Sequence, residues 1–213
     1  MAPDQASTGT RWAGVPVARR KDERRDMLIE AAFALFGADG ESALSVRAVC
    51  REAGLHTRYF YENFADTSEL LADLYDRQAA ELGEALFQAL DEAGPDPERR
   101  TRAGIRSVLR HISDDPRRGS VLFAEVAGNE VLAARRKAAE TAMLEGIIAM
   151  ASLKEPPLPL VVAATMFTGA MNELARQWCD GRLGTDLDAV VDAAVAYSLS
   201  LLATANRLRP QAR

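Results

Sequence analysis

The polar segment at residues 56–64 carries the side chains best suited to bind a nucleic acid. Its outward-facing residues are expected to be Thr57, Arg58, Tyr59, Tyr61 and Asn63. An arginine can donate two hydrogen bonds to guanine O6 and N7, a contact that discriminates between bases by about 1–3 kcal/mol. Hydroxyl and amide groups can bond to base edges or to phosphate. Arg58 is equally compatible with a base contact and with a phosphate contact or a solvated charge.

Two short helices joined by a glycine turn are expected to hold this segment. Ser45 is a typical N-cap for a helix over residues 45–53, and Gly54 breaks that helix before a second one at about residues 57–64. The apolar residues of the pair predict a shared core of Val49, Cys50, Leu55, Phe60 and Phe64. This is the helix-turn-helix pattern, whose second helix fits the major groove of DNA. Many helical bundles contain such a pair, so a purely structural role is an alternative.

Longer helices are predicted on both sides of the pair. A stripe of apolar residues predicts a helix from Asp22, after a disordered arm at residues 1–17. Asp66 and Glu69 form the capping pattern of a longer helix that ends at Gly94–Pro95 and can reach from one small domain into another. Further helices are expected at about residues 97–113, 116–126, 129–152, 158–179 and 185–208.

The predicted fold class is therefore all-α, with about nine helices and no alternating strand pattern. We expect three parts: the arm, a three-helix helix-turn-helix domain at residues 18–66, and a helical domain at residues 67–213. The composition argues against a globally disordered chain, since 48% of the 213 residues are hydrophobic.

The net charge of −5 does not exclude DNA binding. Residues 1–64 hold equal numbers of basic and acidic residues, so the acidity belongs to residues 65–213. The basic cluster at residues 19–25 is typical of a solvated arm, and it could also lie along phosphates or in a minor groove.

The sequence contains no pattern of a catalytic or metal site. Cys50 and Cys179 stand far apart without a CxxC motif, which predicts a reducing, cytoplasmic setting, and Cys50 is expected to be a buried apolar side chain. The nucleophile, phosphate-loop and zinc motifs are absent, and we expect no cofactor. His111 beside Asp114 and Asp115 is the one acid–base grouping, at a helix end where surface capping is the expected role.

No secretory signal or membrane span is expected. Residues 1–26 lack a continuous apolar stretch. The most apolar run, from Leu158 to Met171, is 14 residues long, shorter than the about 20 that cross a bilayer.

Four motifs occur in order between residues 22 and 75: RDMLIEAAFALF (25–36), LSVRAVCREAGL (44–55), RYFYENF (58–64) and ELL (69–71). Together with Gly40 they closely resemble the DNA-binding domain of the tetracycline-repressor-like (TetR) family. The resemblance implies a homodimeric transcription regulator, usually a repressor. It also implies a helical body that holds an effector pocket and pairs through its last two long helices.

The resemblance also implies roles for individual residues. Arg47 resembles the residue that reaches a base or phosphate, and Thr57, Arg58 and Tyr59 resemble the exposed recognition positions. Tyr61 resembles the tyrosine that contacts backbone phosphate.

Two positions depart from the family pattern. His56 stands where the family often has Ser or Thr, so Thr57 or water would cap the third helix. Thr67 stands where a lysine commonly binds phosphate. The loss of that charged contact lowers the magnitude of the slope of the logarithm of affinity against the logarithm of salt concentration by about 1. Asn63 and Thr67 complete the expected DNA-binding set.

The body is expected to supply a dimer interface and a pocket. The helices at about 158–179 and 185–208 would form a four-helix interface with a second copy, and the alternative is that they only complete the core of a monomer. The candidate pocket residues are Phe87, Phe123, Met143, Met166, Phe167, Met171, Asn172 and Trp178. Such a lining predicts a small hydrophobic effector held by few polar groups.

The sequence thus predicts a sequence-specific regulator that binds an operator on double-stranded DNA and is not an enzyme. The alternatives are an all-α enzyme acting on a small molecule and carrying a helix-turn-helix, and a non-specific DNA-binding protein. The acidic body disfavours the second alternative, because it opposes indiscriminate attachment to DNA.

Overall fold

The computed structural model of the chain describes residues 17–123, 129–150 and 155–208. Across these ranges the chain forms nine α-helices, one short 3₁₀ helix and no strand, which confirms the all-α prediction. Residues 1–16 of the expected arm lie outside the described residues, as do the last residues of the helices expected at 116–126 and 129–152.

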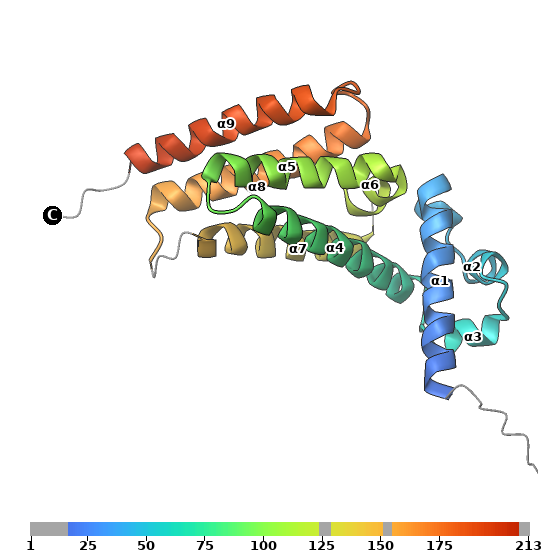
Figure 1. Cartoon of the computed structure of the whole chain (residues 1–213). Coiled ribbons are helices and arrows are strands. Elements are labelled where there is room, and N and C mark those ends of the chain that lie inside the picture. Colours follow the sequence, from blue (N-terminus) through green and yellow to red (C-terminus); the bar gives the residue numbers. More distant parts are fainter. Residues whose placement is uncertain (1–16, 124–128, 151–154, 209–213) are drawn as a thin grey trace, which may run out of the picture.

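Three helices form a head at one end of the molecule (Figure 1). They are α1 (Val17–Asp39), α2 (Val46–Glu52) and α3 (Thr57–Tyr61), with the 3₁₀ helix η1 (Glu41–Ala43) between the first two. The prediction that the first helix starts at Asp22 is wrong. Arginine and lysine are good helix formers, and the basic cluster extends α1 toward the N-terminus. The third helix is also shorter than expected, because turns follow Tyr61.

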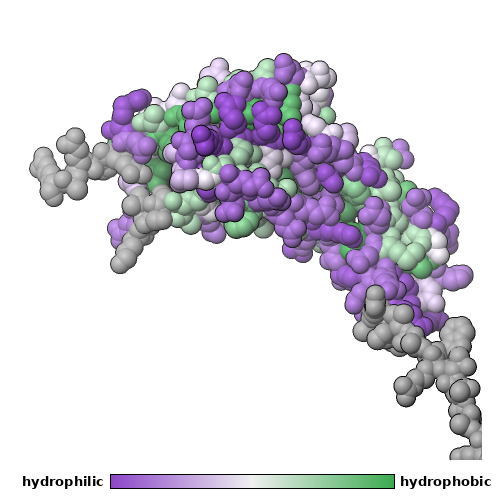
Figure 2. All heavy atoms as spheres, in the orientation of Figure 1, coloured by the Kyte–Doolittle hydropathy of each residue, from purple (hydrophilic) through white to green (hydrophobic). Residues whose placement is uncertain are grey.

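Six helices form the elongated body. They are α4 (Thr67–Glu92), α5 (Pro97–Asp114), α6 (Pro116–Leu122), α7 (Glu130–Met150), α8 (Leu158–Cys179) and α9 (Leu187–Arg207). Helix α5 contacts α4, α8 and α9, and α7 contacts α4 and α8. Hydrophilic side chains cover most of the visible face, with smaller hydrophobic areas on the body and in the head (Figure 2).

Helix α4 connects the head to the body. Its 26 residues span about 39 Å at 1.5 Å per residue. At its start the Asp66 carboxylate accepts from the amides of Ser68 and Glu69 at 2.8 and 2.9 Å. The Glu69 carboxylate accepts in turn from the Ala65 amide at 2.6 Å. The predicted reciprocal cap is therefore confirmed. The backbone amide that donates to Glu69 belongs to Ala65, one residue before the N-cap Asp66 that usually supplies it.

Helix α1 is packed on more than one side. It contacts α2 and α3 within the head, and also α4 and α6. Leu28 and Ala32 are fully buried in a cluster that extends through the head and also includes Val121 of α6 and Leu132 of α7. A single apolar core therefore runs from the head into the adjoining end of the body.

A close approach between Gly37 and Arg117 holds α1 against α6. A Cβ built on Gly37 would lie 2.4 Å from Cγ of Arg117, so only glycine fits there. The Arg117 guanidinium lies 4.5 Å from the centre of the Phe33 ring. It also bonds to both carboxylate oxygens of Asp115, at 2.8–3.2 Å, and these bonds lower the pKa of Asp115.

A second core lies between α5, α8 and α9. It includes Ile105, Leu109, Met171, Val191 and Val195. Helices α8 and α9 are long and apolar enough to cross a membrane, although only 33% and 11% of their most apolar 18-residue windows are buried. Two such helices are weak evidence for a span, because the core helix of a soluble protein passes the same test. The 14-residue apolar run from Leu158 to Met171 forms the first part of α8.

His111 is buried at the junction of α5 with α6, so the expected surface role is wrong. Its side chain is 8% exposed, and its buried Nε2 has no hydrogen-bond partner among the described residues. Burial, and then the positive charge of Arg118, lower the pKa of His111 against the opposing effect of Glu81 and two aspartates.

Replacing Gly37 by alanine is expected to destabilise the protein by about 1–3 kcal/mol, because the new methyl group would displace the Arg117 stem. Gly83→Ala is the control, since nothing lies within 4 Å of a Cβ there and alanine favours the helix by about 1 kcal/mol. Chemical denaturation measures both changes, and a stabilised Gly37→Ala variant would contradict the packing described.

Stability is expected to fall as the pH drops from 7.5 through about 6.5, the ordinary pKa of histidine. His111 has a lower pKa in the folded chain, so the unfolded chain binds the proton more readily and acid favours unfolding. Urea denaturation of the wild type and of His111→Gln at pH 7.5 and 5.5 measures this contribution. The variant should lose less stability than the wild type, and an equal loss would exclude His111 as a source.

Candidate functional site

The turn between α2 and α3 presents α3 at the surface of the head. The Ser45 hydroxyl caps α2 by accepting from the Ala48 amide at 3.2 Å, as predicted. Gly54 has a φ of 64°, a left-handed conformation that favours glycine, and the Leu55 amide then donates to the Cys50 carbonyl at 2.9 Å. Phe60 is fully buried beneath the turn.

The predicted core of this pair is confirmed. Val49, Cys50, Phe60 and Phe64 are at most 3% exposed, and Leu55 packs against them. Burial also raises the pKa of the Cys50 thiol, as expected for a cysteine that serves as an apolar side chain. The rings of Phe60 and Phe64 lie 5.7 Å apart, and this contact fixes the buried side of α3.

Four of the predicted DNA-binding residues lie where solvent can reach them, three on the outward side of α3 and one on α2. Thr57, Arg58 and Tyr61 are exposed, as is Arg47 on α2. The Arg58 side chain is 76% exposed and Tyr61 is 63% exposed. His56 precedes α3 without a side-chain cap. These four side chains therefore form a polar face that can approach a duplex.

Tyr59 is half-buried rather than fully outward. The Arg24 guanidinium lies 4.6 Å from the centre of its ring, and that of Arg58 lies 5.3 Å from it. The Glu62 carboxylate pairs with both arginines, at 3.6 Å from Arg24 and 3.2 Å from Arg58. This network holds Arg58 in place at the edge of the face.

The expectation that Asn63 faces outward is wrong. It is 8% exposed, and its amide donates to the Tyr59 carbonyl at 2.7 Å. Its own carbonyl accepts from Arg25 at 2.7 Å. The residue closes the end of α3, because the helix stops at Tyr61 and the free carbonyls there need donors.

Arg25 is a residue that the sequence reasoning missed. It bonds to the carbonyl of Asn63, ion-pairs with Asp73 on α4, and lies 4.3 Å from the centre of the Phe64 ring. It therefore ties α1, α3 and α4 together. Within the basic cluster no sequence signal distinguishes it from a solvated arginine.

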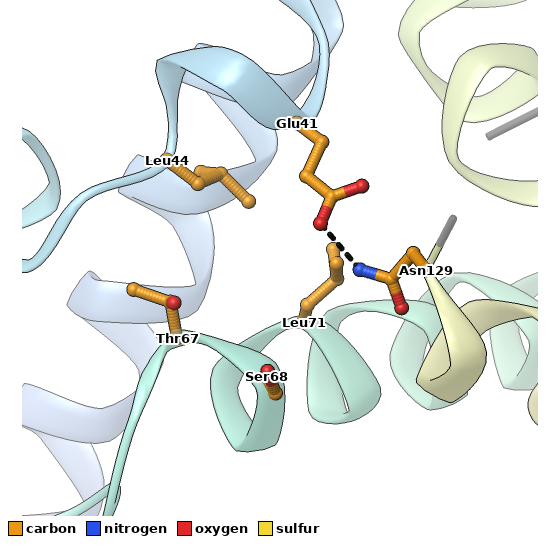
Figure 3. A pocket seen from close by; sticks show the side chains of 6 residues that line it. All are labelled: Glu41, Leu44, Thr67, Ser68, Leu71 and Asn129. Atoms are coloured by element: carbon orange, nitrogen blue, oxygen red, sulfur yellow. Dashed lines mark hydrogen bonds between the residues drawn. The ribbon is translucent and has the colours of Figure 1, made fainter. Parts of the chain in front are cut away.

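Thr67 lies in a small hollow of about 80 Å³ where the head meets the body. Figure 3 shows this hollow between η1, the start of α4 and the start of α7. Across it the Asn129 amide donates to the Glu41 carboxylate at 2.5 Å. The Asn129 carbonyl oxygen also caps α7 by accepting from the Leu132 amide. Thr67 is half-buried there, so its hydroxyl is less available than the exposed face of α3.

The body contains a cavity of about 1340 Å³ between α4, α5, α7, α8 and α9. Five of the eight predicted pocket residues line it: Phe123, Met143, Phe167, Met171 and Asn172. Most of the lining is apolar, including residues such as Leu82 and Leu86 of α4.

Three of the predicted pocket residues do not line the cavity. Phe87 and Met166 are 74% and 58% exposed, because each lies one residue, or about 100° of helix rotation, from a side chain that faces inward. Trp178 packs in the second core instead, where its indole nitrogen donates to the Ser113 hydroxyl at 2.9 Å. Apolar character alone did not indicate which side each residue faces.

The cavity also has polar groups at defined places. Arg136 of α7 and Tyr75 of α4 line one end, and burial lowers the pKa of Arg136 and raises that of Tyr75. The Asn172 amide donates to the Glu140 carboxylate at 2.9 Å. Arg100 lies farther along, where its Nη1 donates to the Leu90 carbonyl at 2.9 Å.

The acid–base grouping around His111 is not assembled as a site. His111 is buried, and the Asp115 carboxylate is engaged by Arg117 and by the start of α6. Within the described residues no group of three His, Cys, Asp or Glu side chains could hold a metal ion.

The head is similar to a known protein family. The model of the family described as bacterial regulatory proteins, tetR family, matches residues 28–74. That range extends from the middle of α1 through α2 and α3 into α4, so it includes the whole helix-turn-helix.

The fold of the whole chain is similar to solved transcriptional regulators. The fatty acid degradation regulator FadR from Bacillus halodurans matches with a TM-score of 0.69 at 17% identity, covering 83% of this chain and 94% of its own. A tetR-family regulator from Streptomyces coelicolor matches at 0.70 and 18%, covering 88% and 84%. FadR from Bacillus subtilis, solved in complex with stearoyl-CoA, matches at 0.65 and 17%, covering 82% and 97%.

The family match covers the residues that build the exposed α3 face, and the shared fold extends through the body. The TetR resemblance is thereby confirmed. The head of this chain is similar to the tetR family of bacterial regulatory proteins, and most of the chain shares the fold of solved transcriptional regulators.

Proposed function

We propose that this protein is a DNA-binding transcription regulator, a cytoplasmic homodimeric repressor that leaves its operator when a small hydrophobic effector occupies the cavity of the body. The observation that carries the proposal is a shared helix. Helix α4 begins beneath the head, where Leu71 is buried, and its later residues Leu82 and Leu86 line the cavity. A ligand that shifts this helix would change how the two heads of a dimer are spaced.

The polar face of α3 would read the operator in the major groove. In this proposal Arg58 and Thr57 contact base edges, and Arg47 contacts a base or a phosphate. Tyr61 contacts the backbone, and Tyr59 covers it beside Arg24. Thr67 keeps at most a weak phosphate contact, and Asn63 supports α3 from inside without touching DNA.

Helices α8 and α9 supply the proposed dimer interface. Val191 and Val195 of α9 face the core of their own protomer, so this side of the helix is not a free surface. The unpartnered face of the two helices instead includes Val162, Met166 and Tyr197, at 47%, 58% and 78% exposure. A second copy would cover this face and would present two α3 helices to a palindromic site.

A long apolar effector fits the dimensions of the cavity. The volume of about 1340 Å³ exceeds the roughly 300–1,000 Å³ of ordinary ligand pockets. FadR from Bacillus subtilis, which shares the fold, was solved with stearoyl-CoA. That observation supports a ligand with a long hydrocarbon chain for the present protein as well.

Selection of bound sequences from a random DNA pool tests the operator-binding part of the proposal. A palindromic consensus is expected, and adding it upstream of a reporter should lower transcription when the protein is present. Equal enrichment of all sequences would favour the non-specific alternative, and raised transcription would identify an activator.

Replacing Arg58 by alanine is expected to weaken operator binding by about 1–3 kcal/mol and to relax one base position in each half-site. Fluorescence anisotropy and repeated selection measure the two effects. Arg182→Ala is the control, because it removes the same charge from the exposed turn between α8 and α9. Weaker binding without relaxed specificity would assign Arg58 to phosphate.

Replacing Tyr197 by aspartate is expected to convert the dimer to a monomer, because a carboxylate would be buried without a partner at the interface. Sedimentation equilibrium measures the mass, and operator affinity should fall at least tenfold. Phe87→Asp is the matched control, since that aromatic residue is 74% exposed on α4. A wild-type chain that sediments as a monomer at every concentration would overturn the dimer.

A further inference from the structure

The cavity of the body has a half-buried cation at the end nearest the head, with a buried Nε atom. Tyr75 is the first residue of α4 that lines the cavity, and Arg136 lies near the start of the lining stretch of α7. The other lining residues of this end include the apolar Leu122 and Phe123. A positive charge therefore lies beside apolar walls, a position that would normally be costly.

Arg136 has hydrogen-bonding capacity that the described residues leave unused. Its Nη2 donates to the Val121 carbonyl at 3.0 Å. Its Nε is buried and has no partner among the residues that the structure describes, and none of their carboxylates pairs with it. The nearby phenol of Tyr75 does not compensate the charge, since an ordinary phenol is neutral near pH 7 and burial raises the pKa of Tyr75 further.

The other charged residues of the lining are already compensated or lie elsewhere. Lys137 pairs with Glu140 at 3.0 Å, and Arg176 pairs with Glu173 at 2.6 Å. Arg100 lacks a carboxylate partner in the described chain, but its guanidinium bonds to backbone carbonyls at the opposite end of the cavity. Arg136 is thus the cation positioned to bind a ligand at the inner end.

The apolar lining of the cavity is long enough for one extended hydrocarbon chain. The lining residues of α4 run from Tyr75 to Leu90, which is about 22 Å at 1.5 Å per residue. Leu82, Leu86 and Met143 lie between these ends. A ligand that fills this length must be mostly hydrocarbon.

We propose that the cavity binds an elongated amphipathic anion, whose carboxylate accepts hydrogen bonds from Arg136 and whose hydrocarbon chain runs toward Arg100. The inference rests on the proposed effector-binding function and adds the charge and orientation of the ligand. A carboxylate matches the guanidinium in charge and in planar geometry, and charge-assisted bonds of this kind strengthen away from water.

Isothermal titration with three probes of equal chain length tests the charge. The probes are decanoate, methyl decanoate and decylamine. The wild-type protein is expected to bind decanoate at least tenfold more tightly than the ester and not to bind the amine measurably. This comparison needs no variant, and a wild type that binds the ester or the amine as tightly as decanoate overturns the proposal.

Two variants test the orientation. Arg136→Gln should remove the preference for decanoate over methyl decanoate, while Arg100→Gln, which deletes the charge at the other end, should retain it. Thermal denaturation confirms that each variant is folded. A preference that survives in Arg136→Gln and disappears in Arg100→Gln would reverse the orientation and overturn the assignment to Arg136.

Operator release separates this inference from the proposed function. Anisotropy with labelled operator is measured with the same probes. If decanoate binds through Arg136 but the operator stays bound, the ligand assignment holds and effector release fails. If decanoate releases the operator equally from the wild type and Arg136→Gln, release holds and the role of Arg136 is overturned.

Discussion

The position of the head depends on the packing of α1 against two parts of the chain at once. Leu28 and Ala32 are fully buried in a cluster that continues to Val121 and Leu132 of the body. Removing one large aliphatic side chain from such a core costs about 2–5 kcal/mol. Because one apolar cluster continues from the head into the body, the two parts are in direct contact.

The surface available for recognition is smaller than the number of basic residues suggests. Arg24 stacks on Tyr59 and Arg25 joins α1 to α3 and α4, so both stabilise the head from within. The exposed side chains of α3 and Arg47 are left to meet a duplex. A face this small makes few contacts, which is consistent with a regulator that gains specificity by presenting two copies.

The cavity and the head are connected at more than one point. Helix α4 belongs to both. Asn129, which directly precedes α7, caps that helix with its side chain and also bonds to Glu41 in the head. Arg136 lies two turns farther along α7, at the inner end of the cavity. A charge bound there would act on a helix whose capping residue already bonds to the head.

The sequence by itself determined the order of the helices, the helix-turn-helix, the cap at Asp66 and the buried rings of Phe60 and Phe64, because local spacing and capping encode these features. The tertiary structure decided which neighbours each remaining side chain meets. Asn63 turned inward because α3 ends early, and Phe87 turned outward because it lies one residue from the lining stripe. Arg25 and Arg136 became distinct from other arginines only when segments far apart in the chain enclosed them, and periodicity carries no information about such enclosure.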